Sequence, residues 1–550
     1  HAWICTPAGI LKGTGKAGVR VFTPEDGLPF TEFTCASVGH GVAWFGTTKG
    51  VIRYSGGQFA YRQGKRWLPG DHVEDIVAMP NVNAWVLTNG GVAHLTSKVT
   101  TFEQKAAYYN DIIDEHIKRT EYGYTAEVSV GAPGKIVDVR HHDSDNDGLW
   151  TSMYGAAQCF AYAATKDPAA KARAKQAFEA LRFLQKVTQG GEHSPPKGYV
   201  ARTILPTSGP DPNIGRIERD RREQETGDKL WKVYEPRWPK SADGKWYWKS
   251  DTSSDEIDGH YFFYAAYYDL VADTEDEKAR VREVVDDLTT HFVDHNFQLI
   301  DHDGKVTRWG EYSPEALNGD PHWWVERGLN SLSMLSYLAV AEHMTGDPKY
   351  GEAIRLLCDE HHYNQNAMVA KIQYGVGSGN QSDDEMAFMS YYNLIKYAKD
   401  EDLRRQMQHS FFHYWKLEFP EMNPFFNFVY AASCVGATQT TQWGVVDLNP
   451  YDGWLADSIA TLKGFPLERF NWAVENSHRL DIVPLGRQQG RDPDDREPPR
   501  RGLRTNGKVL PVEERFFNHW NTDPYVLDYG GNGTGLASGT VFLLPYYMGL

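Results

Sequence analysis

A change in the period of the hydrophobic residues near position 100 most constrains the fold. From about residue 101, apolar side chains recur every three to four residues, which is the spacing of one face of an α-helix. Several predicted helices are joined by links as short as Lys166-Asp167-Pro168 and Gly346-Asp347-Pro348, and short links favour antiparallel pairs. The predicted helices cover residues 101–119, 149–165, 168–188, 254–272, 275–295, 325–346, 348–362, 382–399, 401–416, 424–436, 452–463 and 466–476.

These paired helices predict a mainly α fold, an (α/α) toroid of about six helical hairpins with one helix of each pair inside a ring. The expected inner helices near 148–163 and 261–268 are rich in small and aromatic residues, whereas the expected outer helices near 169–185 and 275–289 carry charges. We expect residues 101–480 to form the toroid. Residues 481–550 are then a C-terminal strap that packs on it.

Residues 1–100 carry a repeat with a period of about 41 residues. The segments AWICTPAG (2–9), AWFGTTKG (43–50) and AWVLTNGG (84–91) share the motif W-x-x-T-x-x-G, and an apolar run follows each glycine. This motif is typical of β-propeller blades, but three copies are too few to close a propeller. We therefore expect a small, partial propeller-like β-repeat domain. Within it, GTGKAG (13–18) matches a dinucleotide-binding pattern, but no helix follows, so we interpret it as a hairpin turn.

Composition narrows the classes of function. The formal net charge is −16 and there is no basic block, so nucleic acid is disfavoured as a partner. No apolar run reaches the length of a membrane span. The 5 cysteines are scattered and predict neither a disulfide framework nor a zinc ribbon. Aromatic residues make up 13% of the chain, an excess that a sugar-stacking cleft would explain. Because the first residue is His1 rather than Met, we interpret the chain as processed or trimmed.

Polar and aromatic motifs occur where the expected inner helices begin. In a toroid these helices run in the same direction, so their N-termini meet at one mouth. Acidic residues at a helix start also act as simple caps, which explains any single motif. Their repetition on several helices favours a shared site. The motifs are DSDNDGLWTSMY (143–154), SSDEIDGHYF (253–262), PHWWVERGLNS (321–331), SDDEMAF (382–388) and NPFFNFVY (423–430).

Candidate site residues follow from these motifs and from two further segments. The insertion at about 190–250 is polar and predicted to be non-helical; its tryptophans either form a wall over the mouth or bury the base of the insertion. The catalytic candidates are Asp255, Glu256, His260, Tyr261, Asp384 and Glu385. The substrate-binding candidates are Trp150, Tyr154, Arg202, Trp324, Glu326, Arg327, Asn330, His519, Trp520 and Asn521.

A calcium site is a secondary prediction, and no cofactor is required. Asp143, Asp145 and Asp147 match the first half of an EF-hand loop. Tyr154 stands at the twelfth position, where that loop needs Glu, so a capped turn is the simpler interpretation.

The combination of repeats and motifs resembles a group of secreted bacterial proteins from polysaccharide-utilisation systems, and within it the rhamnose–glucuronate lyases. The resemblance is carried by HHDSDNDGLWTSMY (141–154), WKSDTSSDEIDGHYFFYAAYYDLV (248–271), DHDGKVTRWGEYSP (301–314), WWVERGLNS (323–331) and SDDEMAF (382–388). It implies a secreted or periplasmic toroid enzyme that acts on a polysaccharide or oligosaccharide containing uronate.

Three functions remain open at this point. In β-elimination, Arg202, Arg327, Asn330 or Asn521 would hold the uronate carboxylate, while His260, Tyr261 or Tyr154 would move the protons. In hydrolysis, the pairs Glu256–Glu385 or Asp255–Asp384 would act as acid and base. The resemblance favours elimination, whereas the acidic mouth favours hydrolysis. The third function is glycan binding or sensing without turnover.

Overall fold

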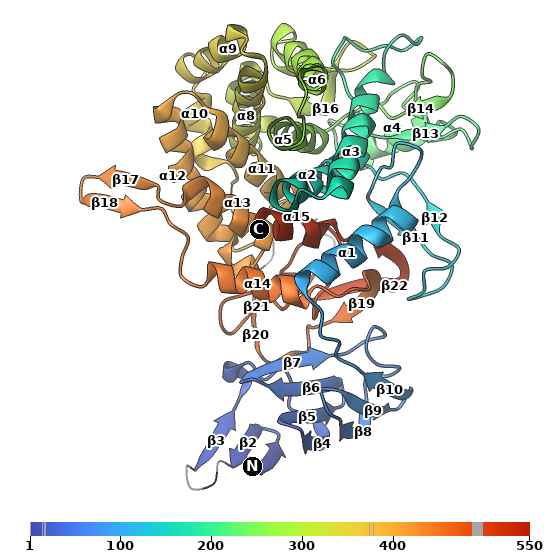
Figure 1. Cartoon of the computed structure of the whole chain (residues 1–550), viewed down its shortest axis with the longest axis vertical. Coiled ribbons are helices and arrows are strands. Elements are labelled where there is room, and N and C mark those ends of the chain that lie inside the picture. Colours follow the sequence, from blue (N-terminus) through green and yellow to red (C-terminus); the bar gives the residue numbers. More distant parts are fainter. Residues whose placement is uncertain (1, 14, 16–17, 373–374, 378, 487–498) are drawn as a thin grey trace.

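The structure is a computed structural model that describes residues 2–13, 15, 18–372, 375–377, 379–486 and 499–550. A β unit at one end of the molecule is followed by a larger helical body (Figure 1). The hairpin predicted at 13–18 lies partly outside the described residues, although the strands on either side of it pair antiparallel. All five cysteines are free. None of the described helices combines the length and the apolar character needed to cross a membrane.

The β unit consists of three antiparallel sheets, and the predicted repeat occupies the same position in each. The Trp–Thr half of the motif forms one strand and the glycine begins the next strand. In every copy the threonine hydroxyl donates to the carbonyl of the glycine three residues later, at 3.0, 2.7 and 2.9 Å. The sheets are β1 (Trp3–Thr6), β2 (Gly9–Gly13) and β3 (Val19–Phe22); β4 (Phe33–Gly39), β5 (Val42–Thr47), β6 (Gly50–Ser55) and β7 (Gln58–Arg62); and β8 (Val73–Ala78), β9 (Ala84–Thr88) and β10 (Gly91–Leu95).

The three sheets stack in chain order, and among the described residues of this unit only the middle sheet is covered on both faces. Val51 in the middle sheet is fully buried against the third sheet, whereas the equivalent Val92 in the third sheet is 61% exposed. Phe45 is buried against the first sheet, whereas the equivalent Ile4 is 58% exposed. Within the described residues, the stack is therefore open rather than a closed propeller.

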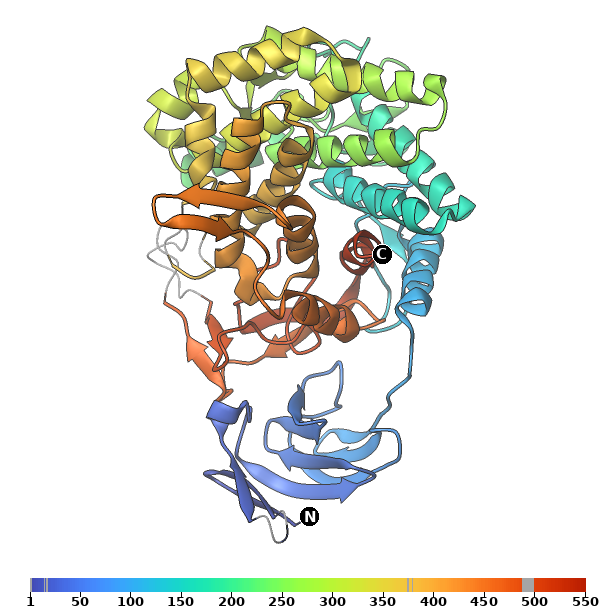
Figure 2. The same cartoon turned by 60° about the vertical axis from the view of Figure 1, so that its left-hand side comes forward.

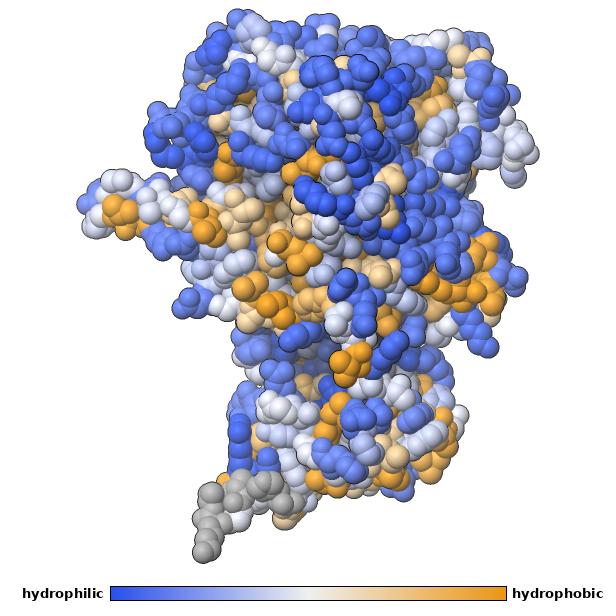
Figure 3. Space-filling view, viewed as in Figure 1, coloured by the Kyte–Doolittle hydropathy of each residue, from blue (hydrophilic) through white to orange (hydrophobic). Residues whose placement is uncertain are grey.

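In Figure 3 the hydrophobic residues in view gather over the lower half of the molecule, and the upper part is mostly hydrophilic.

The helical body contains five pairs of consecutive helices within the described residues. The first helix of each pair contacts the first helix of the next pair. The pairs are α2 (Asp147–Thr165) with α3 (Pro168–Lys186), α5 (Ser254–Leu270) with α6 (Glu275–Asp294), α8 (Arg327–Thr345) with α9 (Pro348–Asp359), α11 (Gln381–Tyr397) with α12 (Glu401–Glu418), and α13 (Pro424–Cys434) with α14 (Trp454–Gly464).

The C-terminal helix α15 (Thr540–Met548) closes the ring, because it contacts both α13 and α2. In Figure 2 it is the red helix between the orange and cyan helices. Helix α1 (Phe102–Ile112) packs against α15. The arrangement is that of an (α/α) toroid, but six successive hairpins are not confirmed, since α1, the first helix of the helical body, and α15, its last helix, supply the sixth pair. The ring is not hollow throughout, because α5 and α11 also contact each other.

The short links end one helix and start the next by the expected local chemistry. Lys166 adopts a left-handed conformation after α2, the Asp167 carboxylate accepts a hydrogen bond from the backbone N–H of Ala169, and Pro168 occupies the first helical position. The link between α8 and α9 uses Gly346, Asp347 and Pro348 in the same way.

Three parts of the sequence-based prediction are wrong. The helix predicted at 466–476 is strand β19 (Phe470–Glu475). The insertion predicted to be non-helical contains α4 (Arg216–Thr226). The predicted boundary at 480 divides a continuous sheet in the order β12-β11-β22-β19, in which β22 (Asp528–Ala537) joins β19 to β11 (Glu127–Ser129) and β12 (Arg140–His141). Residues after 480 therefore supply a strand and a ring helix rather than an external strap.

The remaining elements are short. A protruding hairpin, β17 (Thr438–Thr441) and β18 (Gly444–Asp447), follows α13 and is visible at the left of Figure 1. The others are α7 (Pro314–Gly319), α10 (Tyr363–Asn366), β13 (Ile204–Pro206), β14 (Trp246–Trp248), β15 (Gln298–Ile300), β16 (Val306–Glu311), β20 (Ile482–Pro484) and β21 (Gly502–Arg504).

Candidate functional site

A C-terminal segment links the starts of two ring helices. The His519 ring stacks on Trp150 at the start of α2, with ring centroids 4.0 Å apart. The Asn521 side-chain amide donates to the Ser382 hydroxyl at the start of α11, at 3.3 Å. Between them, Trp520 is buried in the aromatic core rather than lining the mouth. Distant stretches of the chain therefore meet at the starts of the ring helices.

Three partly exposed carboxylates lie at this mouth: Asp255 at the start of α5, Glu326 just before α8, and Asp383 at the start of α11. Burial raises the pKa of all three carboxyls. The charge of Asp255 raises the pKa of Glu326 further, and both charges raise the pKa of Asp383 to well above its ordinary value. The three groups are therefore within electrostatic reach of one another.

The predicted acid pair, Glu256 and Glu385, lies one layer below these carboxylates. Both side chains are fully buried. The Glu256 carboxyl packs against Gly148, where a Cβ would lie 2.0 Å from its Oε2. Burial raises the pKa of both glutamates well above the ordinary value, and the charge of Asp255 raises both further. The two glutamates thus lie on the same side of the molecule, but neither is exposed to a substrate in the mouth.

The third buried carboxylate of this layer, Asp384, is held in an ion pair. The Lys371 Nζ lies 2.6 Å from each of its carboxylate oxygens, and the Tyr414 hydroxyl donates to Oδ1 at 2.6 Å. These contacts hold the Asp384 carboxylate in place beneath Asp383 and give it a structural role.

His260 and Tyr261 do not face the mouth, contrary to the prediction. The His260 Nδ1 lies 2.6 Å from the backbone oxygen of Glu256, and burial lowers its pKa to about 4. The Tyr261 hydroxyl bonds to Thr289 on the outer helix α6 at 2.7 Å. Tyr154 is also buried, and burial raises its pKa well above the ordinary value. The predicted bases and acids of an elimination are therefore core residues.

The predicted substrate-binding residues divide into two groups. Arg202 is buried, and it donates to the backbone oxygens of Asp145 and Asp251 at 3.0 and 3.2 Å. Asn330 is buried and donates to the backbone oxygen of Glu311 at 2.9 Å. In contrast, Trp324 is 49% exposed beside Glu326, and Arg327 is partly exposed at the first position of α8.

The predicted calcium ligands bind cationic side chains instead. Asp147 is buried against Arg119, and Asp145 pairs with Lys249 and Arg202. Asp143 is partly exposed beside them. In the described part of the chain, no group of three or more His, Cys, Asp or Glu side chains is arranged to hold a metal ion. The interactions of Asp145 and Asp147 contradict the calcium interpretation.

The tryptophans of the 190–250 insertion mostly bury its own base. Trp238, Trp246 and Trp248 are buried, and Trp231 is partly buried. At the centre, Arg237 bridges Asp220 and Asp251 at 2.6 and 3.0 Å. The insertion is therefore a packed subdomain, and these rings do not form the expected sugar-stacking wall.

Sequence reasoning missed Asp383 and Lys371. Asp383 directly precedes Asp384 and Glu385, which were predicted to be catalytic. Which of these three residues faces outward depends only on the rotation of α11 about its axis. Lys371 comes from the segment between α10 and α11, which shows no helical period that would place it. The signal available for Asp383 was its presence in the SDDE motif itself.

A pH-dependent stability is expected from Asp258, which is buried next to the mouth. Burial raises its pKa from 3.8 to about 7, although the Ser390 hydroxyl, which donates to Oδ1 at 2.7 Å, opposes this shift. The folded state therefore retains a proton that the unfolded chain has lost, and stability falls as pH rises from about 4 to about 7. The free energy of unfolding of the wild type should fall by on the order of 4 kcal/mol over this pH range because of Asp258, and Asp258→Asn should remove this fall.

Urea unfolding at about pH 4 and about pH 8 measures this effect. The exposed Asp276 in the first turn of α6 provides the matched control, because Asp276→Asn should leave the pH dependence as it is in the wild type. Equal pH dependence in Asp258→Asn and the wild type would contradict the argument.

Comparison with known proteins gives structural neighbours only. No family model matches the chain, and no curated protein matches its sequence. A thermostable endoglucanase from Alicyclobacillus acidocaldarius aligns at 11% identity over 92% of this chain and 95% of its own, with a TM-score of 0.37. A sugar epimerase from a ruminal bacterium aligns at 11% identity over 81% and 98%, with a TM-score of 0.35. These similarities are too low to establish a family or an activity.

Proposed function

We propose that the protein is a glycoside hydrolase whose acid and base are Asp383 and Asp255. The observation that supports this is the convergence of Asp255, Glu326 and Asp383 as partly exposed carboxylates with raised pKa values. Glycoside hydrolysis requires two carboxyl groups, one protonated to donate to the leaving oxygen and one ionised to assist water or attack. Neighbouring carboxyls whose environments separate their pKa values meet this requirement.

The environments of the two residues assign their roles. The pKa of Asp383 is raised well above its ordinary value by burial and by the charges of Glu326 and Asp255, so it stays protonated and acts as the acid. At Asp255, the positive charge of Arg202 opposes the effect of burial, so Asp255 ionises more easily and acts as the base. Glu326 helps to keep the proton on Asp383. Trp324, exposed beside Glu326, offers an aromatic face on which a sugar ring can stack.

Elimination on a uronate is less well supported. The residues expected to move its protons are buried away from the mouth. The ionised carboxylates at the mouth would also repel an anionic sugar. A saccharide remains the proposed partner, and a secreted or periplasmic location stays a prediction from resemblance.

Incubation with a polysaccharide panel tests the proposal. The panel contains β-glucan, α-mannan, arabinogalactan and polygalacturonate, and two products are measured together: new reducing ends and the ultraviolet absorbance of unsaturated uronate. Hydrolysis predicts reducing ends without a rise in absorbance. A matching rise in absorbance would show elimination instead. Binding to a panel member without either product would show a binding protein.

A further inference from the structure

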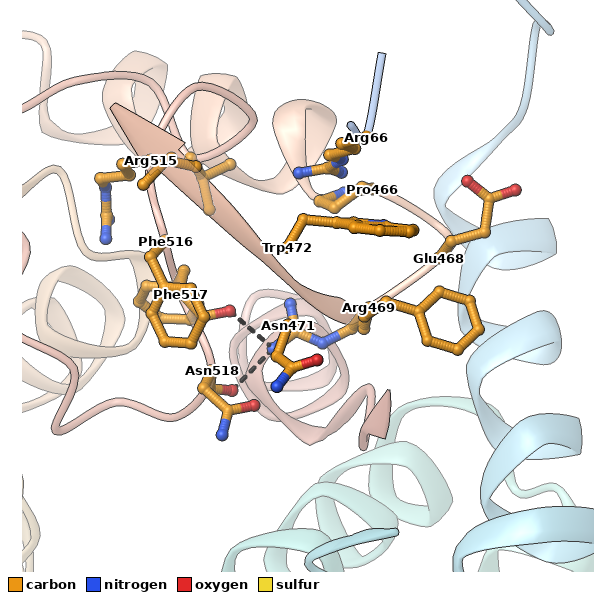
Figure 4. Close-up of a pocket in the computed structure, with 13 residues that line it drawn as sticks. Arg66, Pro466, Glu468, Arg469, Asn471, Trp472, Arg515, Phe516, Phe517 and Asn518 are labelled. Carbon is orange, nitrogen blue, oxygen red and sulfur yellow. Dashed lines mark hydrogen bonds between the residues drawn. The ribbon is translucent and has the colours of Figure 1, made fainter. Parts of the chain in front are cut away.

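A second pocket lies where the β unit meets the helical body, away from the mouth. Its walls come from three places in the chain: the turn after β7, which carries Arg66; strand β19, which carries Trp472; and the segment 512–518, which carries Arg515. Figure 4 shows Arg66 and Trp472 above Arg469, with the segment 515–518 beside them. No residue proposed for hydrolysis lines this pocket.

Three arginines line the pocket without carboxylate partners. Arg469, 6% exposed, donates through Nε to the backbone oxygen of Ser538 at 2.8 Å, and through Nη2 to those of Phe517 and Asn518 at 3.2 and 2.7 Å (Figure 4). Arg515, 5% exposed, donates through Nε to the backbone oxygen of Leu510, and its buried Nη1 has no partner within the described residues. The buried Nη2 of Arg66 also has no partner there.

None of the three guanidinium groups has a carboxylate within ion-pair distance in the described part of the chain, although the charge of Glu513 reaches Arg66 and that of Glu421 reaches Arg515. Burial lowers the pKa of each arginine to about 10, and the charges of Arg62 and Arg469 lower the pKa of Arg66 further, against the opposite effect of Glu513 and Glu468. Buried guanidinium groups are normally paired with an anion. Among the described residues that line the pocket, Glu468 is the only carboxylate, and it is exposed. The pocket is therefore matched to an anionic group from outside.

An aromatic ring adjoins the cations. The Trp472 ring packs on the backbone of Gly134 and Gly533, where added Cβ atoms would lie 2.7 and 2.4 Å from it. It remains partly exposed and lines both this pocket and the neighbouring hollow along Lys65 and Asp71. A flat indole next to guanidinium groups is suited to a ligand with a ring and an oxyanion. Arginine forks bind carboxylates and sulfates through paired hydrogen bonds.

We propose that this pocket is a saccharide-binding site that takes the acidic group of a glycan, a carboxylate or a sulfate ester, with the sugar ring against Trp472. The site goes beyond the proposed hydrolysis and does not depend on it. It would hold an acidic part of a glycan at the junction with the β unit, while the acidic mouth acts on another part. The acidic group then binds where the chain offers cations rather than carboxylates.

Calorimetric titration with three oligosaccharides tests the site: oligogalacturonate, a sulfated carrageenan oligosaccharide and a neutral galacto-oligosaccharide. The wild type should bind at least one acidic probe and bind the neutral probe much more weakly. Whichever acidic probe binds more tightly identifies the oxyanion. Equal binding of acidic and neutral probes, or no binding of either acidic probe, would overturn the proposal. Because binding is measured without turnover, the result is independent of whether hydrolysis is found.

Variants locate the binding. Arg66→Gln should weaken binding of the acidic probe roughly tenfold or more, because it removes a charge-assisted contact. Arg66→Lys, which keeps the charge but loses the fork, should fall between this variant and the wild type. Trp472→Ala should weaken binding through loss of stacking. Arg20→Gln, an exposed charge on β3, is the control and should bind as the wild type does. Folded Arg66→Gln and Trp472→Ala variants with unchanged affinity would place the ligand elsewhere and overturn the proposal.

Discussion

Asp383→Asn is expected to lower kcat on a natural glycoside by roughly 10²–10⁴-fold, because an amide cannot donate the proton that the leaving oxygen needs. The same variant should retain most of its kcat on an aryl glycoside, whose leaving group departs without protonation. Asp255→Asn should lose activity on both substrates, since it removes the base. The measurement is kcat on the two substrates after the polysaccharide panel has identified the sugar.

The pH profile separates the two roles further. Asp383 acts in its protonated form, so the wild-type rate should fall as pH rises through its raised pKa. The wild type should show this alkaline limb on the natural glycoside, whereas Asp383→Asn on the aryl glycoside should lack it and keep the acidic limb, which reports ionisation of Asp255. Above the raised pKa of Asp383, its ionised carboxylate is repelled by the charges of Glu326 and Asp255, so at such pH the thermal unfolding temperature of Asp383→Asn should equal or exceed that of the wild type.

Asp402→Asn is the matched control, because Asp402 also stands in the first turn of a helix, the outer helix α12, and is exposed. Its kcat should match the wild type. The assignment fails if Asp383→Asn keeps full activity on the natural substrate. It also fails if Asp383→Asn loses activity equally on both substrates, because then the residue acts at a step other than protonation.

The convergence of distant helix starts was predictable, whereas the outward-facing carboxylates were not. Helices paired through short links are antiparallel, so the inner helices of successive pairs run in the same direction. Residues 255, 326 and 383 stand at or next to the starts of these helices and therefore meet at one mouth. Which residue of SDDE faces the opening depends on a helix rotation of about 100° per residue, finer than the accuracy of a predicted helix start. The prediction therefore named Asp384 and Glu385, which are buried, and passed over Asp383.

The ring closure was beyond sequence reasoning for a different reason. Helix α15 is apolar on nearly all sides and contains Pro545, so it shows neither an amphipathic period nor a normal helix composition. Strand β19 was predicted as a helix because the hydrophobic pattern of its six residues fits either a helix or a strand. Its pairing with β22, about sixty residues later in the chain, makes it a strand. Both errors concern contacts between segments far apart in the sequence, which local patterns do not report.

Lys371→Met is expected to lower the free energy of unfolding by about 3–5 kcal/mol, because it leaves the buried Asp384 carboxylate without its cation. Lys399→Met is the control. Lys399 pairs with Glu342 at 3.0 Å but its side chain is 66% exposed, so its loss should change stability by less than about 1 kcal/mol. Urea unfolding at neutral pH measures both variants. The double variant Lys371→Met/Asp384→Asn should be more stable than the sum of the single changes predicts, since the unpaired charge is gone.

The pH dependence of this loss identifies its cause. The Lys371 charge is the main influence that lowers the pKa of Asp384, against the raising effect of burial. Without Lys371, the folded pKa of Asp384 lies further above the unfolded value, so the variant loses more stability as pH rises and less below about pH 3, where the carboxyl is mostly protonated in both states. A loss that is equal at low and neutral pH would mean that Lys371 stabilises the fold by packing of its methylene groups. Lys371 also lowers the pKa of Asp383, so the alkaline limb of the activity profile should move to higher pH in the same variant.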